Sequence, residues 1–176
     1  MNRTLRNVLI AALLVVAQVF LFNNIQLRGL LDSFVAPCVY ILFILLMPMS
    51  TSHVKLMFTS FALGFAIDLL SGTLGINTAA CVLIGFLRPT TLKVLLNRED
   101  RNNSMRPTIH TLGRTQYLIY TFTLTLTFHL VLCFLEVFTL YEFYFTLLRA
   151  ILSAIASTLL IVILELFFEK KVKRYR

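Results

Sequence analysis

The stretch Gly64-Phe-Ala-Ile-Asp68-Leu-Leu-Ser-Gly72-Thr-Leu-Gly75-Ile-Asn77 places one carboxylate between two apolar runs, immediately before a turn rich in Gly and Ser. Each flanking run is long enough to cross a bilayer. An Asp in a spanning helix raises the free energy of membrane insertion by roughly 2.5–3.5 kcal/mol at the helix centre and by less near a helix end. Such a residue ordinarily faces other helices or a polar cavity, so Asp68 is a candidate functional residue.

The composition of the whole chain indicates membrane insertion. Of the 176 residues, 59% are hydrophobic and 14% are charged, whereas a soluble domain carries about 25% charged residues. The apolar residues occur in long blocks, which favours an integral membrane protein made of one helical bundle. The net charge is +8, but the basic residues lie between and beside the apolar blocks. Membrane topology therefore explains this charge better than nucleic-acid binding does.

Six apolar runs predict an all-α membrane protein, with six transmembrane helices in a single domain over residues 1–176. A proline separates the second run from the third, because Pro48 disfavours the helical conformation at the residue before it. A count of five helices, in which one of these two runs is fused or dropped, stays open. The polar stretch 97–116 is expected to be a basic cytoplasmic loop, and 169–176 a basic tail. The predicted helices cover residues 7–22, 34–49, 54–70, 74–96, 117–140 and 143–168.

The distribution of Lys and Arg predicts the orientation. If six helices alternate, 14 of the 16 Lys and Arg fall on one side of the membrane. Positively charged loops stay in the cytoplasm, so both termini are expected there. The first run also resembles a secretory signal peptide, but it continues past the position of cleavage and more spans follow, so we expect an uncleaved helix. The 14 residues are Arg3, Arg6, Lys55, Arg88, Lys93, Arg98, Arg101, Arg106, Arg114, Lys170, Lys171, Lys173, Arg174 and Arg176.

Small residues mark helix faces that can pack tightly. Ser60, Gly64 and Asp68 are spaced by four, which places them on one face of the third predicted helix. Small side chains on such a face allow another membrane helix to approach closely. The fourth and sixth predicted helices carry comparable residues, namely Gly75, Ala79, Gly85, Ala150, Ala154 and Ser157.

Several polar residues are expected at similar depth in the outer half of the membrane. With a rise of about 1.5 Å per residue, Gln18, Asp68, Asn77 and Arg149 can form one polar cluster. An Asp68–Arg149 pair would lower the cost of burying both charges, although Glu142 competes for the same arginine. These positions are interpreted as helix-packing or partner-binding candidates.

The inner half offers a second expected pair, Arg88 with Glu165. Catalysis has little support, because no second acid, His or Ser base accompanies Asp68, and no phosphate loop or metal spacing occurs. We therefore expect no cofactor, no metal and no enzymatic activity. His129 is interpreted as a hydrogen-bond donor in helix packing, and the turn through Gly72 and Gly75 as the bend of a helical hairpin.

Three segments resemble a known family. The segments are Gln18-Val-Phe-Leu-Phe-Asn-Asn-Ile-Gln-Leu27, then Gly64 through Ala80, and Val82-Leu-Ile-Gly-Phe-Leu-Arg88-Pro89. They are similar to the rod shape-determining protein MreD family. The similarity extends over most of the chain and is sharp in residues 64–89, where the pattern of Gly, acid and Ser/Gly is fairly specific.

The resemblance implies a non-enzymatic scaffold of the cell-elongation (rod) complex, in the inner (cytoplasmic) membrane of bacteria. Its implied partners are an MreC-like single-pass membrane protein and an MreB-like cytoskeletal filament. They also include a RodA-type glycosyltransferase with a class B penicillin-binding protein, which link the family to peptidoglycan synthesis and cell shape. The fold of this family is also similar to that of the substrate-binding subunits of energy-coupling-factor transporters. The alternative function is therefore a solute-binding subunit of a vitamin-type transporter. Membrane lipids are expected contacts of the basic loop.

Overall fold

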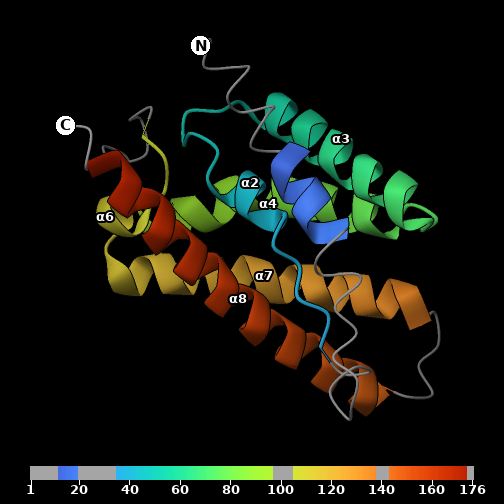
Figure 1. The fold of residues 1–176 in the computed structure, drawn as a ribbon. Helices are drawn as coiled ribbons and strands as arrows, with labels where there is room; N and C mark the ends of the chain where they lie inside the picture. Colours follow the sequence, from blue (N-terminus) through green and yellow to red (C-terminus); the bar gives the residue numbers. More distant parts are fainter. Residues whose placement is uncertain (1–11, 20–34, 97–104, 138–142, 174–176) are drawn as a thin grey trace.

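The computed structural model describes residues 12–19, 35–96, 105–137 and 143–173, with side chains described up to residue 167. Within these ranges every regular element is a helix (Figure 1), so the all-α prediction is confirmed for them. Residues 12–17 are α-helical and 18–19 continue as a π-type turn. The labelled helices are α2 (Ile41–Leu45), α3 (His53–Ser71), α4 (Ile76–Leu95), α6 (Ile109–Leu112), α7 (Arg114–Val137) and α8 (Phe143–Lys173).

Four helices, α3, α4, α7 and α8, are long and apolar enough to cross a membrane. This indicates a multi-pass membrane protein. Each begins and ends within a few residues of a predicted helix, since apolar length defines a membrane helix well. Half of the first predicted helix, over 7–22, lies outside the described residues, and so do residues 97–104 and 174–176 of the predicted loop and tail. The count of six spans and the placement of the termini stay predictions.

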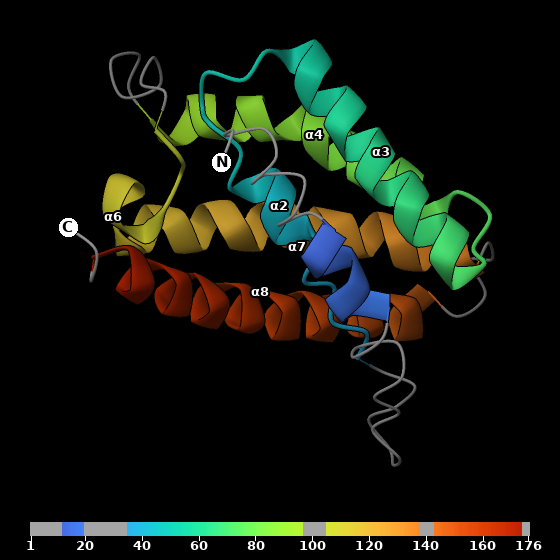
Figure 2. The same ribbon diagram turned by 45° about the horizontal axis from the view of Figure 1, so that its top comes forward.

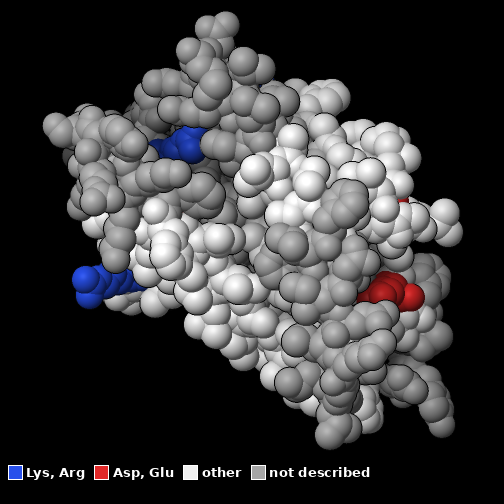
Figure 3. Space-filling model, viewed as in Figure 1, with Lys and Arg blue, Asp and Glu red and all other residues white. Residues whose placement is uncertain are grey.

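The long helices follow one another in the order α3, α4, α7, α8 (Figures 1 and 2). The α4 helix packs against both α3 and α7, and α8 packs against α7; the short α2 lies against α3 and α4. The starts of α3 and α7 and the ends of α4 and α8 lie at one end of the bundle (Figure 2). We call this the basic end, because Lys55, Lys93, Arg106 and Arg114 belong to it. On the face shown in Figure 3, positive side chains gather toward this end and acidic ones lie at the other.

The prediction of a helix over residues 34–49 is wrong for most of its length. Residues 35–39 have no regular secondary structure, and only Ile41–Leu45 form a short helix. Pro37 provides the physical reason, since it lacks an N–H and disfavours the helical conformation at Ala36. This non-helical segment is nevertheless central, with Val39 and Tyr40 almost completely buried.

The predicted loop over 97–116 is also wrong at its C-terminal side. Residues 109–112 form α6, and α7 begins at Arg114, three residues before the predicted start of that helix. Thr108 and Thr111 form a capping box at α6, in which each side chain bonds to the backbone of the other residue. Gly113, with φ of 82°, allows the chain to turn directly from α6 into α7.

Candidate functional site

Asp68 lies near the end of α3 and bonds to the start of α4. Its Oδ1 accepts hydrogen bonds from the Thr73 hydroxyl, from the backbone N–H of Asn77 at 3.1 Å and from the Asn77 side-chain amide at 3.0 Å. Its Oδ2 accepts from the backbone N–H of Thr78 at 2.8 Å and from the Thr78 hydroxyl at 2.5 Å. The carboxylate therefore holds the end of one helix and the beginning of the next.

This arrangement is an N-cap supplied from the preceding helix. The first N–H groups of a helix have no partner within it, and an N-cap side chain usually accepts from them. The N-cap of α4 is Gly75, which has no side chain. Asp68 takes over that role for the second and third helical residues, Asn77 and Thr78. Its negative charge also lies at the positive end of the α4 dipole, which stabilises both.

Two glycines allow the hairpin to close. Gly72 and Gly75 have φ values of 68° and 83°, in the left-handed region that residues with side chains rarely adopt. The N–H of Gly72 bonds to the carbonyl of Asp68 and ends α3. The hairpin predicted from these residues is therefore present, and its turn brings the Asp68 carboxylate against α4.

The predicted small-residue face of α3 lies directly against α4. A Cβ built on Gly64 would lie 2.6 Å from the Cα of Thr78, and one on Gly85 would lie 2.5 Å from the hydroxyl oxygen of Ser60. No real Cβ is found so close to another heavy atom. Gly64 is therefore required for the separation of the two helices, because its neighbours are backbone atoms, as the spacing of Ser60, Gly64 and Asp68 indicates. At Gly85 the nearest atoms belong to the Ser60 side chain.

Arg88 lies one turn beyond Gly85 and is 1% exposed. Its Nε donates to the Tyr120 hydroxyl at 2.9 Å, and its Nη2 donates to the carbonyls of Leu45, at 3.3 Å, and Met47. The Tyr120 hydroxyl in turn donates to the Leu45 carbonyl at 3.0 Å. Arg88 therefore satisfies carbonyls at the end of α2 that have no partner within that helix.

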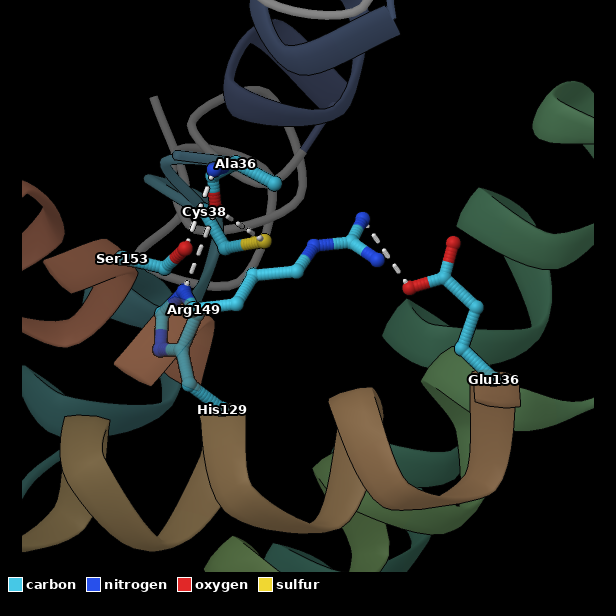
Figure 4. Close-up of polar contacts among 6 residues, drawn as sticks. All are labelled: Ala36, Cys38, His129, Glu136, Arg149 and Ser153. Carbon is cyan, nitrogen blue, oxygen red and sulfur yellow. Dashed lines mark hydrogen bonds and ion pairs between the residues drawn. The ribbon is translucent and has the colours of Figure 1, made fainter. Parts of the chain in front are cut away.

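Both predicted ion pairs are wrong. Glu165, expected to pair with Arg88, accepts instead from the backbone N–H of Ile109 at 2.8 Å and so caps α6. Arg149, expected to pair with Asp68, forms an ion pair with Glu136 instead (Figure 4), with 3.2 Å between Nη2 and Oε2. The reason is the antiparallel packing of α7 on α8, which brings the last turn of α7 beside the first turns of α8. The predicted competitor, Glu142, lies outside the described residues.

Serines on α8 bond to the backbone of the non-helical segment. The N–H of Ala36 donates to Ser153 Oγ at 3.0 Å, and the N–H of Cys38 donates to Ser157 Oγ at 2.9 Å. Figure 4 shows Ser153 beside this segment. Within a membrane no water is available for a free backbone group, so such bonds are needed wherever the chain is not helical.

Gln18 bonds to the same segment from the opposite side. Its Oε1 accepts from the N–H of Val39 at 2.9 Å, and its Nε2 donates to the carbonyl of Pro37 at 3.0 Å. One side-chain amide thus replaces the backbone partner that a helix would provide. The predicted cluster of Gln18, Asp68, Asn77 and Arg149 is therefore divided. Asn77 remains with Asp68 and also accepts from the Tyr40 hydroxyl at 2.6 Å, whereas Gln18 and Arg149 bond elsewhere.

His129 on α7 completes this set of contacts. Its Nδ1 lies 2.8 Å from the carbonyl oxygen of Thr125. Its Nε2 lies 3.2 Å from the Ala36 carbonyl oxygen (Figure 4) and 3.2 Å from the Ser157 hydroxyl oxygen. The Ser157 hydroxyl is also occupied by the Cys38 N–H, and both residues are fully buried. This pair is therefore placed for packing and not for nucleophilic attack.

Ser157→Ala is expected to destabilise the protein by about 1–3 kcal/mol, because it leaves the buried N–H of Cys38 without an acceptor. Thr158→Val is the matched control, since the Thr158 hydroxyl bonds only to the carbonyl of Ala154 in its own helix. Thermal unfolding in detergent and hydrogen exchange at the Cys38 amide measure the two effects. Equal stability of the two variants, with unchanged exchange at Cys38, would contradict this role of Ser157.

Most predicted candidates thus contribute to the helical framework. Among the described residues, no group of three or more His, Cys, Asp or Glu side chains lies close enough to hold a metal ion. The contacts of Ser153, Ser157 and His129 with residues 36–39 were not predicted, and Pro37 was the signal that could have revealed them. The chain matches no protein-family model, no curated protein and no solved structure.

Proposed function

We propose that the protein is a non-enzymatic membrane scaffold of the MreD type, in the bacterial inner membrane. In this proposal it binds the transmembrane helix of an MreC-like protein. Through that partner it links an MreB-like filament to a RodA-type glycosyltransferase and a class B penicillin-binding protein, and so to the control of cell shape. The observation that carries the proposal is that the polar side chains inside the bundle are used to hold the chain together.

Asp68 is the clearest example of this use. Its carboxylate accepts five hydrogen bonds, all from Thr73, Asn77 and Thr78. A carboxylate offers about four lone-pair positions, so none remains for a solute. This favours an architectural role for Asp68 over the solute-binding alternative, which needs a free polar group near this residue.

The outer face of α3 offers a surface for a partner helix. Val54, Phe58, Phe61, Phe65 and Leu69 recur along it at helical spacing, and each is at least 48% exposed. The rings of Phe61 and Phe65 stack with their centroids 5.8 Å apart. Because α3 lies at one edge of the helix order, no other long helix of the described residues covers this stripe. We assign it to the MreC-like helix.

The charge distribution supports an orientation. Lys55, Lys93, Arg106 and Arg114 gather at the basic end, and positive residues favour the cytoplasmic side of a membrane. In the proposal this end faces the cytoplasm and the MreB-like filament. The Asp68 turn then lies toward the periplasm, where peptidoglycan is made.

A photoreactive phenylalanine analogue at position 61 is expected to crosslink a co-expressed MreC-like protein in membranes. The matched control is the same analogue at Phe145, which is 60% exposed on α8 at the opposite edge of the bundle. We expect the crosslinked product from position 61 and little from position 145, because only α3 is assigned to the partner helix. Both sites carry the same reactive group at an exposed position, so the helix is what differs. Immunoblotting of both proteins after irradiation, and co-purification in mild detergent, provide the measurements.

Two failures of this experiment have different meanings. Equal crosslinking from positions 61 and 145, with co-purification, would contradict the assignment to α3 alone. Loss of both co-purification and crosslinking, with the protein present at normal levels, would contradict the scaffold function itself.

A further inference from the structure

A cavity of about 270 Å³ opens at the basic end of the bundle, between the start of α3 and the C-terminal half of α4. Arg88, Lys93 and His53 contribute its basic side chains, and Ser50 and Thr51 contribute hydroxyls. Among the residues that the structure describes, no acidic side chain lines it. The remaining lining residues are Met49, Pro89 and Leu92.

The buried Arg88 carries a charge that no acidic residue of the described ranges balances. Its hydrogen bonds go to three neutral oxygens, those of Tyr120, Leu45 and Met47. No acidic side chain pairs with it among the residues that the structure describes. Burying a charge without an opposite charge is costly, so an anion in the cavity would compensate it. Because the existing bonds use Nε and Nη2, the N–H groups of Nη1 are the ones left to face the cavity.

The depth of these groups matches a lipid headgroup. Arg88 lies seven residues before the end of α4, or about 10 Å along the helix axis. Lys93 and His53 lie at the ends of α4 and α3. The headgroup layer is roughly 5–8 Å thick on each side of a bilayer. The rim of the cavity is therefore at headgroup level, and Arg88 lies just beneath it.

We propose that this cavity binds the phosphate group of an anionic phospholipid such as phosphatidylglycerol. Arg88 donates to the phosphate from below, Lys93 neutralises it at the rim, and the His53 ring and the hydroxyls of Ser50 and Thr51 donate further hydrogen bonds. The volume is just below the range of about 300–1,000 Å³ for small-molecule sites, so it holds a headgroup while the acyl chains stay in the bilayer. Basic pockets between membrane helices commonly bind such headgroups. The proposal requires membrane insertion but is independent of the scaffold function.

The experiment uses the full-length protein in neutral detergent and measures its melting temperature with added short-chain phosphatidylglycerol. Short-chain phosphatidylcholine and inorganic phosphate are added separately at the same concentration. A ligand that binds only the folded state raises the melting temperature. Lys93→Gln is expected to weaken phosphatidylglycerol binding about five-fold, the effect of one cation near a membrane surface. Lys55→Gln is the control, since Lys55 is an exposed lysine of α3 that does not line the cavity.

The outcomes separate the sources of phosphate. Stabilisation by phosphatidylglycerol alone, reduced in Lys93→Gln and unchanged in Lys55→Gln, supports the proposal. The same stabilisation by inorganic phosphate would overturn the lipid assignment. Equal losses in the two variants would show only a general surface charge effect and overturn the site, as would the absence of any stabilisation. Arg88 itself is left unchanged, because it also holds the end of α2.

Discussion

Asp68→Leu is expected to destabilise the protein by about 3 kcal/mol or more, the largest effect of any single substitution in the α3–α4 hairpin. The change leaves the backbone N–H groups of Asn77 and Thr78 and the hydroxyls of Thr73 and Thr78 without their acceptor, and the Asn77 side-chain amide keeps only its bond to the Thr73 hydroxyl. Each buried polar group left unpaired costs about 1–3 kcal/mol. Unfolding can be followed with a thiol-reactive fluorophore, because Cys38, Cys81 and Cys133 are all free and buried in the folded protein.

Asp68→Asn is expected to lie between the wild type and Asp68→Leu. The asparagine side chain keeps one acceptor oxygen, but its NH₂ group then faces the backbone N–H of Asn77 or Thr78. Two donors face each other there, and the backbone N–H is fixed in the helix. About 1–3 kcal/mol of stability is therefore lost, with the hairpin still formed. Equal damage by Asn and Leu would contradict a capping role, since capping needs an acceptor more than it needs a charge.

Gly64→Val is expected to force α3 and α4 apart and to cost about 1–3 kcal/mol or more. Even the first added carbon would meet the Cα of Thr78 at 2.6 Å and the carbonyl oxygen of Asn77 at 2.8 Å. These are backbone atoms, so the start of α4 has to move, and the Asp68 cap is loosened with it. Thermal unfolding with the same fluorophore measures the loss.

Ala62→Val is the matched control for this substitution. It introduces the same side chain on the same helix, at an exposed position. It is expected to stay within about 0.5 kcal/mol of the wild type. A similar loss in both variants would mean that valine in α3, and not contact with α4, is responsible.

The α3–α4 hairpin could be predicted from local sequence. Apolar length defines the two helices, Gly72 and Gly75 mark the turn, and the four-residue spacing of Ser60, Gly64 and Asp68 identifies the packed face. These features act over a few residues, so they can be read without knowing the rest of the fold. The cluster of Asp68 with Asn77 was also predicted. The cap that Asp68 forms on α4 could not be predicted, because capping the next helix and pairing with a distant arginine look alike in sequence.

The non-helical segment was missed for a different reason. Residues 35–40 are apolar and resemble a short helix, apart from Pro37. Their backbone partners, Gln18, Ser153 and Ser157, come from distant parts of the chain. The ion pairs failed similarly, since the pairing of Arg149 with Glu136 depends on how α7 packs on α8. Pattern and propensity describe single elements, whereas these contacts are set by tertiary packing.

The same segment imposes an order on biosynthesis. The N–H of Cys38 is bonded by a serine 119 residues later in the chain, which a ribosome adding roughly 5–20 residues per second reaches about 6–24 s afterwards. Until then, the backbone N–H groups of Ala36 and Cys38 lack the serine acceptors that they have in the finished protein. This part of the chain therefore needs water, the insertion machinery or a chaperone during that interval. This early segment therefore gains its final hydrogen bonds only after α8 has been synthesised.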